Sequence, residues 1–271
     1  MKHFYLITNK QKDTGGRLSD RIRDYIVKKG GICESGPEPS LGTECALCIG
    51  GDGTLIRAAR DLLEKQIPLL GVNQGHVGYL CELDESNVFQ AIDTLWKDQY
   101  TVEERMMLSG VCSHGNITSA PATALNDIVI HRSGFAQMLS LVISVNGEYL
   151  YTCSADGIIL ATPTGSTAYS MSAGGPIVEP GAKLLLVTPI CPHSLNTKSF
   201  VLDAEDEVTI EIASRRAEVA EACEVSFDGE EIIPLAVGDR ITVKRSPLCT
   251  RIVKLNQQSF LEILRKKMQG A

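Results

Sequence analysis

Two kinds of apolar pattern alternate through residues 1–99. Short continuous apolar runs are typical of buried strands, and longer stretches with apolar residues three and four apart are typical of helices. Strands that alternate with helices predict a parallel sheet whose functional residues lie at the carboxyl ends of the strands. Strands are expected at 3–8, 46–49 and 68–72, and helices at 18–29, 55–65 and 86–99.

From Tyr100 onward the pattern changes to many short strand-like runs. Asn146-Gly147 and Asp228-Gly229 predict hairpin turns, so this region should be mostly β, as a sandwich or layered sheet. A helical pattern returns near the C-terminus, at 259–268, and this helix is expected to pack back on the first domain. The predicted organisation is an α/β domain with a parallel, Rossmann-like sheet at 1–99, a β-rich domain at 100–250 and a C-terminal segment at 251–271.

The strand at 46–49 runs directly into a glycine-rich turn that contains a carboxylate, Asp52. Glycines let backbone N–H groups approach an anion, and a helix begins at this turn, so its N-terminus also favours phosphate. A carboxylate beside phosphate is repulsive unless a proton transfer or a metal uses it. Asp52 is therefore a candidate catalytic base or metal-linked group; alternatively, it caps the helix. The predicted phosphate loop consists of Gly50, Gly51, Gly53, Thr54 and Arg57.

Three further polar stretches are candidate ligand sites. Asn73 follows the strand at 68–72, where it either bonds a ligand hydroxyl or supports its own loop through an Asx-turn. Asn126 and Asp127 either offer paired donors and acceptors to ribose hydroxyls or form a turn into a strand. Hydroxyl residues at 162–172 are predicted to begin a helix that suits a polar ligand, with Tyr169 for base stacking; the alternative is a capped Ser/Thr-rich loop.

Composition narrows the class of protein. The chain has 271 residues and a net charge of -7, which argues against a nucleic-acid or anionic-membrane partner. With neither a signal peptide nor a membrane-spanning stretch, a cytoplasmic enzyme is expected. The nine cysteines have no framework spacing, and Cys45 and Cys48, three apart on a strand, should point to opposite faces. That geometry argues against a redox or zinc site, and no set of protein metal ligands is predicted.

Five motifs are distinctive in combination: Gly50-Gly51-Asp52-Gly53-Thr54, Gly71-Val72-Asn73-Gln74-Gly75, Asn126-Asp127, and the stretches 162–170 and 186–195. Together they resemble the NAD kinase family over nearly the whole chain. The glycine loop alone is shared with a wider superfamily that includes diacylglycerol and sphingosine kinases. The resemblance implies transfer of the terminal phosphoryl group of ATP, or of polyphosphate, to the 2′-hydroxyl of the adenosine ribose of NAD, which forms NADP. A divalent ion, expected to be Mg²⁺, would accompany the phosphates.

The resemblance also assigns roles to individual residues. It implies that Asp52 is the general base for the 2′-hydroxyl, and that the protein is a homodimer or homotetramer with NAD and ATP as its ligands. Asp127 stands where many members of the family have Glu. The implied NAD-binding residues are Asp52, Gly53, Asn73, Asn126, Asp127, Asp156, Thr167, Ala168, Tyr169, Ser170, Met171 and Ser172.

Two other functions compete with this interpretation. A lipid kinase of the diacylglycerol type would share the glycine loop, although the chain has no evident apolar or basic membrane-docking segment. A non-catalytic NAD sensor would keep the pocket, although it would have no use for a base at Asp52. Formation of NADP would exclude the sensor.

Overall fold

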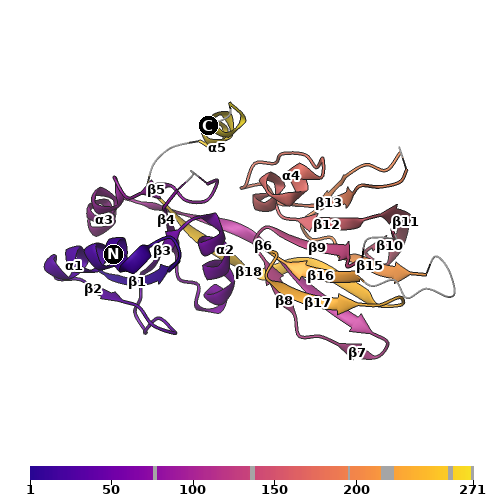
Figure 1. Ribbon diagram of the computed structural model, residues 1–271, viewed down its shortest axis with the longest axis horizontal. Coiled ribbons are helices and arrows are strands. Elements are labelled where there is room, and N and C mark those ends of the chain that lie inside the picture. Colours follow the sequence, from indigo (N-terminus) through magenta and orange to yellow (C-terminus); the bar gives the residue numbers. More distant parts are fainter. Residues whose placement is uncertain (76–77, 135–137, 195, 215–222, 256–258, 270–271) are drawn as a thin grey trace. The chain divides into compact units, whose positions relative to one another are not determined.

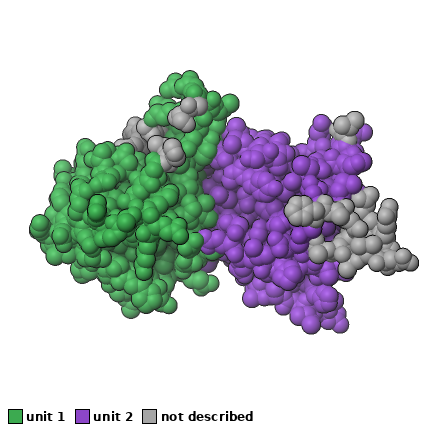
Figure 2. All heavy atoms as spheres, viewed as in Figure 1, with its two compact units in different colours: residues 1–105, 249–271 green, residues 106–248 purple. Residues whose placement is uncertain are grey.

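The computed structural model describes the chain except for residues 76–77, 135–137, 195, 215–222, 256–258 and 270–271. Two compact units are present, coloured separately in Figure 2: Met1–Arg105 with Cys249–Ala271, and Met106–Leu248. The chain passes from one unit to the other along two long strands, β6 (Thr101–His114) and β18 (Arg240–Lys254). The predicted boundaries, after 99 and after 250, lie close to these crossings.

The first unit contains a parallel sheet in the order β4-β3-β1-β2, so the predicted fold class of this half is confirmed. Strands β3 and β4 are buried along their whole length, which explains their continuous apolar sequence. Figure 1 shows α1 and α3 on one face of this sheet and α2 on the other. The elements are β1 (His3–Thr8), α1 (Arg17–Lys28), β2 (Ile32–Glu34), β3 (Cys45–Gly50), α2 (Asp52–Asp61), β4 (Leu69–Asn73), β5 (Leu83–Asp84) and α3 (Val88–Trp96).

The strand order of this sheet reverses between β1 and β3. From β1 the chain continues through α1 to β2 on one side, and from β3 it continues through α2 to β4 on the other. The two loops that follow β1 and β3 therefore leave in opposite directions. In open α/β sheets such a switch point opens a crevice beyond the carboxyl ends of the strands, where ligands bind. The glycine loop lies at this point.

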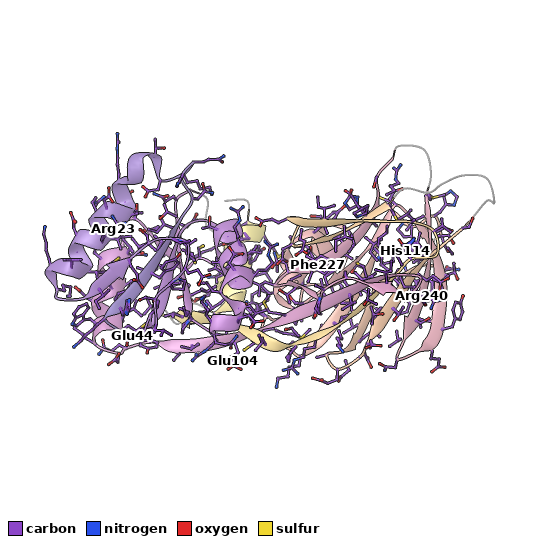
Figure 3. All side chains as sticks on the ribbon, turned by 90° about the horizontal axis from the view of Figure 1, so that it is seen from below. Arg23, Glu44, Glu104, His114, Phe227 and Arg240 are labelled. Carbon is purple, nitrogen blue, oxygen red and sulfur yellow. The ribbon has the colours of Figure 1, made fainter. Side chains whose placement is uncertain are left out.

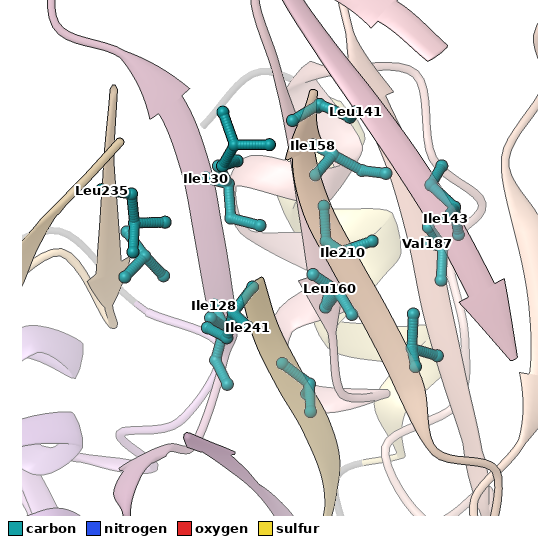
Figure 4. Packing of buried hydrophobic residues seen from close by; sticks show 14 of the residues in the cluster. Ile128, Ile130, Leu141, Ile143, Ile158, Leu160, Val187, Ile210, Leu235 and Ile241 are labelled. Atoms are coloured by element: carbon teal, nitrogen blue, oxygen red, sulfur yellow. The ribbon is translucent and has the colours of Figure 1, made fainter. Parts of the chain in front are cut away.

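The second unit is built from antiparallel strands, as predicted. One sheet has the order β14-β13-β12-β9-β16-β17, and the other runs β11-β10-β15-β18. Inward side chains of both sheets form one apolar cluster, which Figure 4 shows for Ile128 and Ile158 of one sheet and Leu141 and Ile210 of the other. The elements are β7 (Ile117–Thr118), β8 (Ala122–Ala124), β9 (Asp127–Arg132), β10 (Leu139–Val145), β11 (Glu148–Ala155), β12 (Gly157–Ala161), α4 (Tyr169–Ser172), β13 (Leu184–Ile190), β14 (Phe200–Asp203), β15 (Val208–Ala213), β16 (Cys223–Phe227) and β17 (Glu231–Leu235).

Both predicted hairpin turns are present. Asn146 and Asp228 have φ of 52° and 51°, and the following glycines, Gly147 and Gly229, have φ of 80° and 72°. Positive φ at both central residues is the conformation that matches the twist of a two-residue hairpin. The turns join β10 to β11 and β16 to β17.

The C-terminal helix α5 (Phe260–Met268) is grouped with the first unit. It begins with a capping box in which Ser259 and Glu262 bond each other's backbone N–H groups. The ammonium group of Lys267 lies 5.6 Å from the ring centroid of Tyr79, which is a cation–π contact with the first unit.

Candidate active site

The glycine loop joins β3 to α2 in an extended conformation. Gly51 is the N-cap of α2, with φ of 178° and ψ of -175°. A Cβ at Gly50 would overlap the Thr54 hydroxyl and lie 2.9 Å from the Cβ of Asn9, so close packing against the end of β1 requires glycine there. At Gly53, no described atom lies within 4 Å of the corresponding Cβ position. The loop is therefore packed on one side and open on the other, as a phosphate site needs.

Asp52 is fixed by a segment that follows β4. Its Oδ2 accepts a hydrogen bond from the backbone N–H of Tyr79 at 2.6 Å, and its Oδ1 accepts from those of Leu80 at 3.2 Å and Cys81 at 3.1 Å. A Cβ at Gly78 would overlap this carboxylate, so only glycine lets the segment close on it. Gly51 caps α2 without a side-chain bond, so the alternative that Asp52 is the helix cap is wrong. Because each carboxylate oxygen can accept two hydrogen bonds, Oδ2 retains capacity for a substrate hydroxyl.

Asn73 lies beside the glycine loop, as its place at a strand end predicts. It ends β4 in register with Gly50, and the N–H of Gln74 donates to the carbonyl oxygen of Gly50 at 2.9 Å. A Cβ on Gly51 would lie 3.7 Å from the Asn73 Oδ1. The turn that follows β4 is thus next to the glycine loop. Arg57, also predicted in the phosphate loop, is exposed on α2.

A second carboxylate, Asp228, organises the Asn126-Asp127 turn in the other unit. Its Oδ2 accepts from the N–H of Leu125 at 2.8 Å, and its Oδ1 accepts from those of Asn126 at 2.8 Å and Asp127 at 3.2 Å. The ring of Phe227, labelled in Figure 3, fixes the base of this hairpin, because a Cβ at Gly110 on β6 would lie 2.8 Å from it. Sequence reasoning classed Asp228 as part of a hairpin turn and did not assign it to the site.

Asp127 is an unusual carboxyl group. Burial, together with the neighbouring charge of Asp228, raises the pKa of Asp127 to about 7, because both disfavour its ionised form. Its exposed fraction is 6%. Asp127 therefore titrates near neutral pH, where a bound ligand can change its protonation.

The hydroxyl-rich segment packs on the same turn. The N–H of Thr162 donates to the carbonyl oxygen of Asn126 at 2.9 Å, and the Thr162 hydroxyl donates to that of Leu125 at 2.6 Å. A Cβ at Gly165 would overlap the Asn126 carbonyl, so glycine is required. The structure therefore brings two sequence-predicted stretches, Asn126-Asp127 and the segment from Thr162, together within the second unit.

The predicted helix in this segment is only partly present. A 3₁₀ turn at Thr164–Thr167 and the single turn of α4 are separated by Ala168, which has φ of -100° and ψ of -130°. Tyr169 and Met171 are exposed at 46% and 38%, as ligand-binding side chains would be. Ser170 is fully buried, and its hydroxyl bonds that of Thr188 at 3.2 Å. Of the remaining predicted residues, Thr167 and Ala168 are half-buried and Ser172 is exposed.

Asp156 makes an ion pair that sequence reasoning missed. Its Oδ1 lies 2.9 Å from the Arg132 Nε, and its Oδ2 accepts a bond of 3.3 Å from Nη2 of the same guanidinium group. Such a two-point pair fixes the carboxylate of the single residue that joins β11 to β12. A lone arginine at the end of an apolar strand carries no motif, so nothing in the sequence marked it.

The cysteine pair in β3 is structural. Cys45 and Cys48 are fully buried, and burial raises the pKa of Cys48 to about 12, so it stays a thiol. Among the described residues, no group of three or more His, Cys, Asp or Glu side chains is placed to bind a metal.

Fold and site together define a class of protein. A parallel α/β unit carries a glycine loop at its switch point, with a helix N-terminus and an anchored carboxylate beside it. An antiparallel β unit carries a polar turn supported by a second carboxylate. These are the features of a nucleotide-binding phosphotransferase.

Comparisons with known proteins identify the family. The family described as ATP-NAD kinase N-terminal domain matches residues 35–100, and the one described as ATP-NAD kinase C-terminal domain matches residues 125–255. The chain is 51% identical over 282 residues to an NAD kinase of Agathobacter rectalis, covering 99% of each chain. It is 42% identical to an NAD kinase of Lachnospira eligens, covering 99% of this chain and 100% of that one. The chain belongs to the NAD kinase family.

Solved structures share its fold. Yeast NADH kinase complexed with NADH superposes with a TM-score of 0.86 at 24% identity, covering 100% of this chain and 88% of that chain. An NAD kinase from Archaeoglobus fulgidus in complex with ATP gives a TM-score of 0.80 at 24% identity, covering 99% of each. At this identity the likeness concerns the fold alone.

Proposed function

We propose that the protein is an NAD kinase that transfers the terminal phosphoryl group of ATP to the 2′-hydroxyl of the adenosine ribose of NAD, forming NADP. The relatives named NAD kinase, up to 51% identical over 99% of the chain, support the activity. The observation that carries the chemistry is the Asp52 carboxylate, anchored by three backbone N–H groups beside the glycine loop.

In the proposed reaction, Asp52 takes the proton from the 2′-hydroxyl. The ribose oxygen forms a bond to the terminal phosphorus, the bond from that phosphorus to its bridging oxygen breaks, and the electron pair remains on ADP. Phosphoryl transfer needs positioning and charge stabilisation. Backbone N–H groups of the glycine loop and the N-terminus of α2 meet that need. A positioned general base typically contributes about 10²- to 10⁴-fold in rate.

A divalent ion, expected to be Mg²⁺, fits this site as a companion of ATP. Mg²⁺ is usually bound through one or two carboxylates together with substrate phosphates and water. Because the remaining acceptor position of Asp52 is assigned to the 2′-hydroxyl, the ligands of the ion would come from the ATP phosphates and water. The ion would neutralise charge on the phosphates.

The second unit would hold NAD. Asn126 and Asp127 would bond ribose hydroxyls from the turn supported by Asp228, and the exposed ring of Tyr169 would stack on the adenine. The remaining proposed contacts are Gly53, Asn73, Asp156, Thr167, Ala168, Met171 and Ser172, while the buried Ser170 would support this segment through its bond to Thr188.

Several broader properties belong to the same proposal. Residues 1–99 would act as the phosphate-loop domain, 100–250 as the NAD-binding domain and 251–271 as a returning segment.

The protein would be cytoplasmic. No described helix is both long enough and apolar enough to cross a bilayer. A homodimer or homotetramer is proposed, supported by apolar side chains exposed on strands at sheet edges, Tyr149, Val201 and Ile232. Light scattering of the purified protein would give the oligomer size.

The test is NADP formation by purified protein supplied with NAD, ATP and Mg²⁺. Asp52→Asn should lose at least about a hundredfold in kcat, because it keeps the shape of the side chain and removes the basic carboxylate. Asp61→Asn, at an exposed carboxylate at the end of the same helix, is the matched control and should retain activity. Wild-type protein that binds NAD without forming NADP would favour the sensor, and phosphorylation of a lipid would refute the proposal.

A further inference from the structure

The segment that follows β1 is folded against the glycine loop. The N–H of Asn9 donates to the carbonyl oxygen of Ile49 at 2.9 Å, and the carbonyl oxygen of Asn9 accepts from the N–H groups of Lys12 at 3.0 Å and Asp13 at 2.9 Å. The buried Asp13 carboxylate then accepts from two N–H groups at the start of α1, at 2.9 and 3.1 Å. The backbone at Lys12 is therefore fixed from both sides.

The Lys12 side chain extends over the loop. Its Nζ donates to the carbonyl oxygen of Gly50 at 3.4 Å, and a Cβ on Gly51 would lie 2.9 Å from the same Nζ. Burial chiefly raises the pKa of the nearby Cys81 thiol; the charge of Asp52 raises it further, and the charge of Lys12 acts in the opposite direction. The ammonium group therefore lies over the residue that caps α2, in the neighbourhood of the proposed base.

This ammonium group retains hydrogen-bonding capacity. Within the described part of the chain, its Nζ donates to the carbonyl oxygen of Gly50 at 3.4 Å, which is longer than the usual range of about 2.7–3.2 Å. An ammonium group has three donors, and lysine binds phosphate as a point charge. Asp52 adds a negative charge to the loop, so a cation beside it would offset the repulsion between that carboxylate and a triphosphate.

We infer that Lys12 binds the terminal phosphates of the phosphoryl donor at the glycine loop. The ligand chemistry is a terminal phosphoanhydride, which ATP and polyphosphate share. The inference rests on the proposed function and adds a donor-specific residue to it. Lys12 would hold the phosphoryl group in place and stabilise the charge that develops on the leaving phosphate.

Lys12→Met removes the charge and keeps most of the chain length, and Lys12→Arg restores a cation. Lys10→Met, an exposed lysine two residues earlier in the same segment, is the control. For Lys12→Met, kcat/KM for ATP should fall about ten- to hundredfold, the scale of a lost hydrogen bond to a charged group. KM for NAD should change less than about twofold, as expected if only donor phosphates are contacted. Lys12→Arg should recover much of the loss, and Lys10→Met should resemble wild type.

ATP affinity, measured by titration calorimetry without NAD, separates this inference from the proposed function. Weaker ATP binding by Lys12→Met with an unchanged Tm would support the inference even if no NADP were formed. Unchanged ATP binding and kcat/KM would overturn it, and so would equal losses for ATP and NAD together with a lowered Tm, which indicate a structural role. Parallel assays with polyphosphate distinguish the two donors. If Lys12→Met lowers kcat/KM with both ATP and polyphosphate, Lys12 binds the phosphoanhydride that they share. If it lowers kcat/KM with ATP alone, Lys12 acts only on the nucleotide donor.

Discussion

Each unit contains a carboxylate that binds three successive backbone N–H groups. Asp52 binds those of Tyr79 to Cys81, and Asp228 binds those of Leu125 to Asp127. In both cases the three N–H bonds divide in the same way, one to one oxygen and two to the other. The local arrangement is the same, so the difference in role must come from what surrounds it.

The surroundings differ in charge. Asp52 lies at the N-terminus of α2, with Lys12 over the adjacent glycines, so the carboxylate itself would be presented to the proposed phosphate site. Asp228 lies in a hairpin beside a second carboxyl group, Asp127, whose pKa it raises. Here the carboxylate holds the backbone of Leu125, Asn126 and Asp127 in position by binding their N–H groups. One arrangement places a chemical group and the other shapes a turn.

The largest effect should come from Gly78→Ala, which would separate the Asp52 carboxylate from the backbone N–H groups that hold it. A Cβ there would overlap the Asp52 carboxylate and displace either the carboxylate or the 79–81 segment. We expect kcat to fall by at least about a hundredfold, as for loss of a positioned base. Steady-state kinetics measure this, with Gly36→Ala as the control because its Cβ would meet nothing within 4 Å. A Gly78→Ala enzyme with normal kcat would show that the anchoring of Asp52 is unimportant.

Asp228→Asn should affect substrate binding instead. The amide keeps one acceptor oxygen and places an NH₂ group against backbone donors, which distorts the Asn126-Asp127 turn. KM for NAD should rise about tenfold or more, while kcat at saturating NAD changes little, the scale expected from disturbed hydrogen bonds to a charged group. If kcat instead fell as far as it does in Asp52→Asn, the proposed difference between the two carboxylates would be wrong.

The stability of the protein without ligands should depend on pH through Asp127. Its pKa is about 7 in the folded protein and 3.8 as the ordinary value, so the folded state binds more protons between these limits. Stability therefore falls as pH rises through this range and levels off above it. Urea unfolding at pH 5.5 and 8.5 should show Asp127→Asn gaining about 2 kcal/mol relative to wild type at the higher pH. Asp24→Asn, at an exposed carboxylate on α1, should show no such gain.

The elements that the sequence predicted well are those with local causes. Apolar runs predicted the positions of β1, β3 and β4. Asn146-Gly147 and Asp228-Gly229 predicted two turns, and both pairs adopt the positive φ that these turns require. The glycine loop followed from its position between a buried strand and a helix. In each case, the residues that determine the structure are neighbours in the chain.

The supports of the site could not be predicted because they join distant backbone groups. Asp52 binds N–H groups 27 to 29 residues away and Asp228 binds groups 101 to 103 residues away, and backbone donors leave no mark on residue type. Lys12 reaches Gly50 across 38 residues. The helix predicted to begin in the hydroxyl-rich run is present only as the 3₁₀ turn at Thr164–Thr167 and the single turn of α4. The reason is local, because the hydroxyl of Thr167 bonds the carbonyl oxygen of Thr164 and competes with helical bonding.

The smallest effect on NAD binding should come from the second support of the Asn126 turn, the buried hydroxyl of Thr162. This hydroxyl donates to Leu125 and accepts from the N–H of Gly165, and its exposed fraction is 0%. Thr162→Val keeps the shape but leaves both partners unsatisfied, so unfolding free energy should fall by about 1 to 3 kcal/mol. KM for NAD should rise less than in Asp228→Asn, because three N–H bonds to Asp228 still hold the turn. A larger rise in Thr162→Val would make the hydroxyl, and not the carboxylate, the main support, and the parallel with Asp52 would then fail.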